Sequence, residues 1–322
     1  MTRFGVRGRL ARGLEGIGRQ ATRFLAVGIF LGVLVPPLAA AARPLLTPAI
    51  FLLIVVTVLR LDPAAVAASL RRPLPLALAV LWVLLGAPLV VVPVAALVGG
   101  AGFLVDHAVL VAASAPVISA VAYAVLLGLD AAFALAVGVV ATALVPFTLP
   151  VLAGVLLGVD LALEPAALLV RLVLLIGGAS AVAVLLRRWW GRERLARRGP
   201  LVDGVAVLAM LTFGLAVMDG VTAAALGRPL FTATALVVVF ALAIGLNLAG
   251  TILFAPFGRR LAMTVGLMSG FKNFGVVVAA MGAAADDLTV VFLGFLQFPI
   301  YLLPVALRTL ARRRLASEGD SR

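Results

Sequence analysis

Cysteine is absent from the 322-residue chain, and histidine (His107) and lysine (Lys272) each occur once. These absences exclude a disulfide framework and leave zinc sites and Cys/His catalysis without ligands or nucleophiles. Charge is scarce as well. Only 12% of the residues are charged and 64% are hydrophobic. In a soluble domain about 25% are charged and about 45–50% are apolar. The composition is therefore that of an integral membrane protein.

Ten hydrophobic segments follow one another along the chain, separated by short loops that carry Pro, Gly, Arg or Asp. They are too long for barrel strands, and an open sheet edge cannot survive in hydrocarbon, so we expect helices. The sequence thus predicts an all-α polytopic membrane protein. The second span is short and could tilt or begin earlier. The predicted spans are 22–42, 46–60, 74–98, 103–128, 131–157, 166–186, 201–222, 230–255, 261–283 and 288–307.

The arginines are unevenly distributed between alternate loops. With the N-terminus inside, 22 of the 25 arginines fall in inner segments, and the outer loops carry acids instead. This positive-inside pattern predicts an even number of spans with both termini cytoplasmic. The net charge of +13 then reflects topology, so nucleic acid is not an expected partner. The excess of arginine over lysine also suggests a GC-rich bacterial genome and hence the inner membrane. The outer acids are Asp106, Asp160, Glu164, Asp286 and Asp287.

The N-terminal region allows two interpretations. Six arginines up to Arg23, an apolar run and the small residues 39–42 are compatible with a cleavable signal peptide. The alternative is a basic interfacial arm, residues 1–21, followed by the first transmembrane helix. We favour the arm, because it is long for a signal peptide and Pro36-Pro37 interrupts the apolar run.

The fourth predicted span contains Ser114, Pro116 and Ser119 within the run Ala113-Ser114-Ala115-Pro116-Val117-Ile118-Ser119. A proline inside a span removes one backbone hydrogen bond and frees a carbonyl group. Taken alone, this pattern is typical of an ordinary proline kink.

Lys272 lies within the ninth predicted span, 12 residues after Arg260 and 14 before Asp286. About 18 Å of helix separates it from the inner end, about three times the reach of a lysine stem. Burial of its ammonium costs about 3 kcal/mol or more unless it faces a cavity or a counter-charge. The few candidate counter-charges are Asp130, Asp203 and Asp219, each of which also suits a loop, cap or interface. The residues that favour a break around Lys272 are Gly266, Ser269, Gly270, Asn273 and Gly275.

Other polar residues within the spans allow more than one interpretation. Asn247 in the eighth span and Gln297 in the tenth either line a cavity or bond neighbouring helices. Tyr123 either contacts a substrate or belongs to a lipid-facing surface. His107 beside Asp106 is expected to form a solvated pair near the outer surface.

Spans four and nine are five apart, so spans 1–5 and 6–10, if they are repeats, enter the membrane in opposite senses. Two interrupted helices at equivalent places in inverted halves indicate the binding site of a secondary transporter. The N-termini of the half-helices would present positive dipole ends to an anion.

These features resemble the bile acid:sodium symporter superfamily. The resemblance rests on the interrupted fourth span, on Pro146-Phe147-Thr148-Leu149-Pro150 and on Gly270-Phe271-Lys272-Asn273, and it covers nearly the whole chain as a pattern. It implies ten helices in a 5+5 inverted repeat, in which helices 4 and 9 cross while unwound. It also implies organic-anion substrates such as steroid acids, keto acids or pantoate-like compounds, cotransported with sodium. The implied division is into panel helices at 22–73 and 166–225, core helices at 74–157 and 230–310, and a cytoplasmic tail at 311–322.

The positions that the resemblance assigns to sodium binding depart from the family pattern. The family's ninth span reads approximately E-x-G-x-Q-N, where this chain has Met268, Gly270, Lys272 and Asn273. Hard cations take several oxygen ligands, and a lysine repels sodium, so we expect neither sodium coupling nor another metal. The other departures are Ser119, Ala120 and Val121 in place of a Ser-Asn pair, and Ala134 and Gly138 in place of Ser and Thr.

We therefore predict a sodium-independent secondary transporter of a small or amphipathic organic anion, in which Lys272 supplies the charge of sodium. Lys272 either exchanges a proton during transport or stays charged in a uniporter or exchanger. A sodium-coupled symporter and an auxin-efflux-like carrier are the alternatives. An enzyme is not expected, because clustered acids are missing, and no cofactor is expected either. The predicted site residues are Lys272, Asn273, Ser269, Gly270, Ser114, Pro116, Ser119, Asn247 and Gln297.

Overall fold

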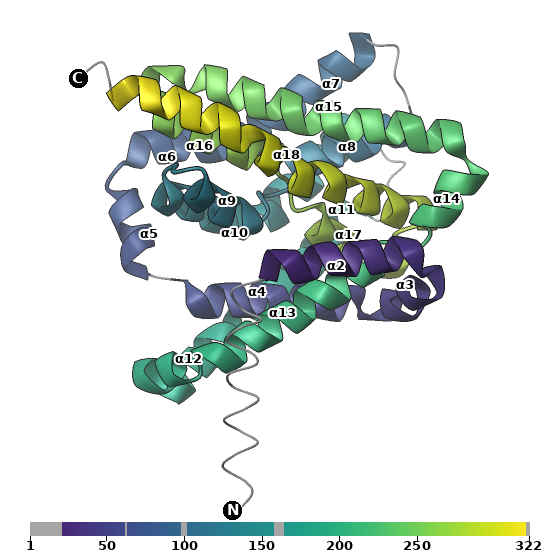
Figure 1. Ribbon diagram of the computed structural model, residues 1–322, viewed down its shortest axis with the longest axis horizontal. Helices are drawn as coiled ribbons and strands as arrows, with labels where there is room; N and C mark the ends of the chain where they lie inside the picture. The colour runs from purple at the N-terminus through teal and green to yellow at the C-terminus, as the bar shows by residue number, and fades with distance from the viewer. Residues whose placement is uncertain (1–20, 62, 98–101, 158–163, 320–322) are drawn as a thin grey trace, which may run out of the picture. The chain divides into compact units, whose positions relative to one another are not determined.

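The computed structural model describes residues 21–61, 63–97, 102–157 and 164–319 (Figure 1). In these ranges the regular structure is helical, apart from a single backbone bridge, which confirms the predicted all-α class. The expected basic arm, up to residue 20, lies outside the described residues.

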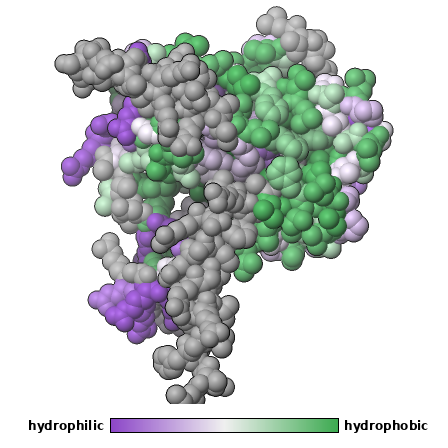
Figure 2. All heavy atoms as spheres, in the orientation of Figure 1, coloured by the Kyte–Doolittle hydropathy of each residue, from purple (hydrophilic) through white to green (hydrophobic). Residues whose placement is uncertain are grey.

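Seven helices among the described residues are long and apolar enough to cross a membrane. Apolar side chains also cover much of the surface in Figure 2, whereas hydrophilic ones gather over α12 (Gly178–Arg197). Leu226 and Leu230 are more than four-fifths exposed, which suits lipid better than water. The chain is therefore a multi-pass membrane protein. The seven helices are Pro36–Arg60, Pro73–Ala95, Ala131–Leu156, Pro165–Gly191, Leu201–Gly227, Pro229–Leu253 and Asp287–Pro304.

Prolines mark the beginning of many of these helices. A proline suits the first helical position because its missing N–H group would have no partner there, and its φ angle is already helical. The helices that begin with proline are α3 (Pro36–Ala42), α5 (Pro63–Leu70), α6 (Pro73–Leu81), α11 (Pro165–Leu172) and α15 (Pro229–Leu253).

The first two spans differ from their predicted bounds. Helix α2 (Ala21–Leu34) is 14 residues long and ends before Pro36, so the predicted span 22–42 is wrong in its second half. Val35, which precedes the proline, has φ −126° and ψ 73° and interrupts the helix, because proline disfavours the helical region in the residue before it. A 25-residue crossing helix then begins at Pro36 and ends at Arg60. It comprises α3, η1 (Arg43–Leu45) and α4 (Leu46–Arg60).

The first of two compact units contains the described parts of residues 1–61, 173–228 and 286–294. Within it α2 packs on α13 (Gly199–Ala216) and the residues just after it. A Cβ atom at Gly32 would lie 2.7 Å from the Cβ of Met218, so glycine permits a close approach of the two helices. The remaining elements of this unit are η3 (Val173–Gly177), α12, α14 (Val221–Gly227) and the start of α18 (Asp287–Gly319).

The second unit contains the described parts of residues 62–172, 229–285 and 295–322. Here α15 and α16 lie side by side (Figure 1). A Cβ atom at Gly250 would lie 3.1 Å from the Cα of Gly266, so the two backbones approach closely. Its other elements are α5, α6, η2 (Trp82–Gly86), α7 (Ala87–Leu97), α8 (Phe103–Ala113), α9 (Ser119–Leu126), α10 (Ala131–Leu157), α11, η4 (Ala255–Phe257), α16 (Arg259–Gly270), α17 (Phe274–Met281), η5 (Gly282–Ala284) and the rest of α18.

Candidate functional site

Two helices of the second unit are interrupted where the sequence predicts it. Helix α8 ends at Ala113 and α9 begins at Ser119, while α16 ends at Gly270 and α17 begins at Phe274. The predicted interruptions of spans four and nine are therefore confirmed. Because each of these spans is interrupted, neither forms one of the seven long crossing helices.

The two unwound segments pair with each other through their backbones. The amide of Val117 donates to the carbonyl of Phe271 at 2.9 Å, and the amide of Asn273 donates to the carbonyl of Ala115 at 2.7 Å. This is an antiparallel bridge in which Pro116 faces Lys272 as the non-hydrogen-bonded pair. Proline is tolerated at that position because no ladder bond requires its missing N–H group. Each break thus satisfies backbone groups that the other leaves unpaired.

Lys272 is buried where the two unwound segments, residues 114–118 and 271–273, pair with each other, with 3% of its surface exposed. We call this place the crossing. Its Nζ donates to the carbonyl of Val83 at 2.7 Å and to the carbonyl of Ser114 at 3.2 Å. Ser114 is the C-cap of α8, where the helix dipole favours a positive charge. The expectation that Lys272 does not reach an exposed position is confirmed.

The carbonyl of Val83 is available because of Pro88, a residue that sequence reasoning missed. Residues Trp82–Gly86 form a π-helical turn, in which the amide of Ala87 donates to the carbonyl of Trp82. In that register the partner of Val83 would be residue 88, and proline has no N–H group to donate. Lys272 takes the place of the missing donor. The presence of a proline within the third predicted span could have indicated that a backbone carbonyl there lacks its helical partner.

Trp82 forms a second link between the same turn and the interrupted ninth span. Its Nε1 donates to Ser269 Oγ at 2.9 Å, and Ser269 Oγ donates to the carbonyl of Val265 at 2.7 Å. Ser114 likewise donates to its own helix, to the carbonyl of Val111 at 2.7 Å. Ser269 therefore links the π-helical turn to α16, whereas the Ser114 hydroxyl bonds its own helix. Lys272 brings a positive charge to the crossing.

The acids considered as counter-charges for Lys272 are engaged elsewhere. Asp130 accepts the amide of Phe133 at 3.1 Å and so caps α10, as its sequence position suggested. Among the described residues, no carboxylate forms a salt bridge with Lys272, whose hydrogen bonds go to carbonyl oxygens. The ion pairs of the three acids are Arg72–Asp130, Arg60–Asp203 and Arg43–Asp219.

Of the other predicted site residues, Asn247 lies against the break in the ninth span. A Cβ atom at Gly270 would be 3.1 Å from the Cβ of Asn247 and would collide with the carbonyl of Ala243. Gly270 therefore permits α15 to pass the end of α16 closely. Gln297 is buried within α18.

Ser119 and Tyr123 lie one turn apart on α9, next to the crossing. The ring of Tyr123 meets that of Phe271 edge to face, with centroids 5.8 Å apart, and Tyr123 is only 5% exposed. The lipid-facing reading of Tyr123 is therefore wrong. The Ser119 Oγ and Tyr123 Oη atoms are both shielded from solvent, and neither hydroxyl has a partner outside this pair among the residues described.

His107 is not solvated, contrary to what the sequence had led us to expect. It is buried in α8, with Nδ1 2.7 Å from the carbonyl of Phe103 and its ring stacked on the Phe103 ring at 3.8 Å. His107 also meets Phe274 edge to face, with centroids 6.0 Å apart. These aromatic contacts give His107 a packing role.

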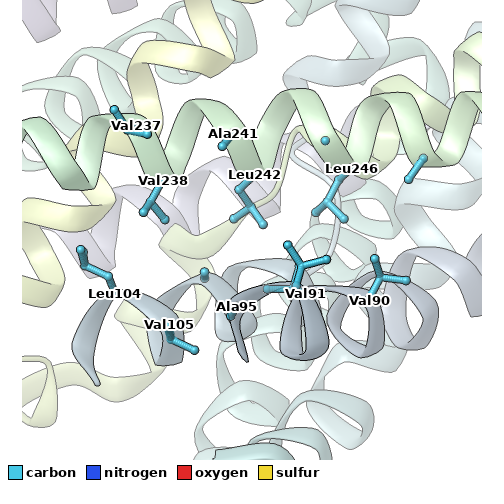
Figure 3. A pocket seen from close by; sticks show the side chains of 14 residues that line it. Val90, Val91, Ala95, Leu104, Val105, Val237, Val238, Ala241, Leu242 and Leu246 are labelled. Carbon is cyan, nitrogen blue, oxygen red and sulfur yellow. The ribbon is translucent and has the colours of Figure 1, made fainter. Parts of the chain in front are cut away.

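An apolar cavity of about 560 Å³ lies between α7, α8 and α15 (Figure 3). Side chains of α15 point across it toward those of α7 and α8, and every residue that lines it is apolar or glycine. It suits a hydrocarbon group and offers no side chain for an anion. The residues that line it on α15 are Val237, Val238, Ala241, Leu242, Gly245, Leu246 and Ala249.

No protein-family model matches the chain, and no curated protein is significantly similar to it. The functional interpretation therefore depends on the geometry of the crossing and on its chemistry.

Proposed function

We propose that the protein is a secondary transporter of a small or amphipathic organic anion that works by alternating access without sodium. The observation that carries this proposal is the ammonium of Lys272, buried at the crossing of two interrupted helices and bound to two carbonyl oxygens. The resemblance to the bile acid:sodium symporter superfamily supplies the transport cycle, and Lys272 supplies the charge that sodium would bring.

The charge balance at the crossing favours an anionic ligand. Carbonyl dipoles stabilise an ammonium but do not cancel its charge, so the site retains a net positive charge when Lys272 is protonated. Two half-helices, α9 and α17, begin at the same crossing, and neither has a side-chain N-cap. Their dipoles add to the positive potential there. A carboxylate bound nearby would neutralise a charge that is costly to bury.

The division of the chain into two units supports alternating access. Both interrupted helices belong to the second unit, which also contains most of the segments expected for a core. The first unit contains most of the segments expected for a panel. Residues 62–73 and 166–172 belong to the second unit and residues 286–294 to the first, which departs from the expected bounds. In this proposal ten helices form a 5+5 inverted repeat in the inner membrane, with both termini cytoplasmic.

The side chains at the positions that would bind sodium support the proposed sodium independence. Met268 and Ala134 are fully buried and have no oxygen to offer. A Cβ atom at Gly138 would be 3.4 Å from the Cε of Met268, so two of the substituted positions lie against each other in an apolar contact. Hard cations require oxygen ligands. An ammonium fixed to Val83 and Ser114 occupies carbonyl groups that such a cation would otherwise use.

The decisive experiment is uptake of cholate, pantoate and 2-oxobutyrate into proteoliposomes, in sodium or choline chloride, with and without a pH gradient. We expect uptake of at least one of these anions in choline chloride. Lys272→Met should reduce that uptake about 100-fold or more, because about 2.7 kcal/mol of ion pairing corresponds to that factor. Stimulation by a pH gradient would assign proton coupling, and its absence would assign uniport or exchange.

Lys272→Arg is the matched control, because it keeps the charge but not the geometry of a compact ammonium. It should retain more uptake than Lys272→Met. Uptake that requires sodium would support the sodium-coupled alternative. Equal uptake by the wild type and Lys272→Met across pH would contradict the role of Lys272.

A further inference from the structure

We infer that the hydroxyl groups of Ser119 and Tyr123 form a hydrogen-bonding subsite for the carboxylate of the transported anion. This inference rests on the proposed function and specifies where the anionic group binds. It assigns to α9 a recognition role that the charge of Lys272 does not perform, because a point charge attracts an anion without fixing its orientation.

The first argument is hydrogen bonding. Tyr123 is 5% exposed and its Oη atom is inaccessible to solvent, as is the Oγ atom of Ser119. A buried hydroxyl without a partner is unfavourable, because it loses its hydrogen bonds to water and gains none in exchange. The two hydroxyls can bond only each other among the described residues. One of them then donates and the other accepts, so at least one O–H group has no acceptor among these residues. A ligand that supplies an acceptor removes that cost.

The second argument is position. Ser119 is the first residue of α9 and Tyr123 follows four residues later, so both side chains lie on one face of the helix. Side chains on a helix point toward its N-terminus, and the N-terminus of α9 lies at the crossing. The ring of Tyr123 contacts Phe271, the neighbour of Lys272 in the chain. Both hydroxyls thus lie at the positive end of a half-helix, beside the interrupted ninth span.

The third argument is chemical type. A phenol and an aliphatic hydroxyl can both donate, and a carboxylate accepts through two oxygens. Hydrogen bonds to a charged acceptor are stronger than those to a neutral acceptor. A neutral amide of the same shape would accept fewer and weaker bonds. The subsite therefore distinguishes a carboxylate from its amide.

The composition of the chain permits a direct test. The sequence has two tyrosines, so the protein carrying ¹³Cζ-labelled tyrosine gives two NMR resonances, and the one that is missing in Tyr123→Phe belongs to Tyr123. This resonance is measured in detergent while cholate, pantoate or 2-oxobutyrate is added, each compared with its neutral amide. We expect at least one carboxylate to shift the resonance saturably, and its amide not to do so.

Substitution gives a second readout. Tyr123→Phe keeps the ring that packs on Phe271, and we expect it to weaken binding of the active carboxylate about tenfold, as loss of about 1.4 kcal/mol predicts. Ser119→Ala should have a similar or smaller effect. Thr232→Val is the matched control, because Thr232 Oγ1 on α15 is another buried hydroxyl atom without a partner. It should leave binding unchanged.

The two proposals fail in different ways. Uptake of a carboxylate without a shift of the Tyr123 resonance, or with equal affinity in Tyr123→Phe, overturns the subsite and leaves the transporter intact. A shift without uptake supports the subsite and contradicts the transport function. No shift with any of the three carboxylates overturns the assignment to a carboxylate.

Discussion

Two arginines of the first unit, Arg43 and Arg60, meet carboxylates, whereas the buried lysine of the second unit meets carbonyl oxygens. Arg43 bonds Asp219 at 3.0 Å and Asp287 at 2.6 Å, and Arg60 pairs with Asp203. Lys272 bonds the carbonyls of Val83 and Ser114. Both arrangements satisfy hydrogen-bond donors. Only the first cancels charge.

This difference separates a structural ion pair from the site that we propose for an anion. The desolvation of two opposite charges is offset by their attraction, so Arg43 and Asp219 need no further partner. An ammonium held by dipoles keeps a net charge, and the low dielectric of its surroundings strengthens its attraction for an anion. The contrast predicts that substitutions in the first unit affect stability above all, while changes at the crossing affect stability and transport together.

The largest effect on stability is expected from Gly270→Val. A side chain at Gly270 collides with the backbone carbonyl of Ala243, which cannot move unless α15 and α16 separate. Overpacking of this kind costs about 3 kcal/mol. We expect a lower temperature of unfolding, measured by tryptophan fluorescence in detergent, together with weakened anion binding.

The matched control for this variant is Gly245→Val on α15. An added Cβ atom at Gly245 meets no atom within 4 Å, so the control tests the loss of glycine in a helix without the collision. It should unfold near the wild-type temperature. Equal destabilisation by the two variants would show that the close approach at Gly270 does not hold the crossing.

Breaking the ion pairs of the first unit should have an intermediate effect. Arg43→Ala leaves Asp219, whose side chain is 16% exposed, without its partner. We expect a loss of about 1–2 kcal/mol, between the values for exposed and buried pairs. Asp287 is 84% exposed, so Asp287→Asn should cost less than about 0.5 kcal/mol. Chemical denaturation in detergent measures both, and an equal loss in the two variants would contradict this ranking.

An effect smaller than that of Arg43→Ala is expected from Trp82→Phe, which removes the indole N–H that donates to Ser269. Loss of one neutral hydrogen bond costs about 1 kcal/mol. Trp189→Phe is the control, because Trp189 is 79% exposed. A double-mutant cycle with Ser269→Ala measures the pair itself, and independent effects of the two substitutions would show that the bond contributes nothing.

Much of the fold could be predicted from the sequence. Hydrophobic length predicted a multi-pass helical membrane protein, of which seven long apolar helices are confirmed. Pro116 and Gly270 marked the two interruptions, because proline and glycine weaken helices in any context. Burial of Lys272 followed from its distance to Arg260 and Asp286 along a helix. The division of the first span at Val35 was also visible in Pro36-Pro37. The second span begins earlier than its predicted bounds, at Pro36, which is one of the two possibilities that its short length left open.

The partners of Lys272 could not be predicted in the same way. Its acceptors are 189 and 158 residues away in the chain, and both are backbone carbonyls, which carry no residue type that a pattern can reveal. His107 was misplaced for a related reason. Its neighbour Asp106 suggested solvent, whereas its stacking on Phe103 and its contact with Phe274 depend on how the helices pack.

The sequence by itself determined a membrane protein with two breakable helices and one costly ammonium, because hydrophobic length, proline, glycine and charge act locally. The tertiary structure alone decided that the two breaks pair through their backbones, and that a π-helical turn before Pro88 leaves the Val83 carbonyl to Lys272. These contacts join residues far apart in the chain, and their geometry arises only when the helices pack.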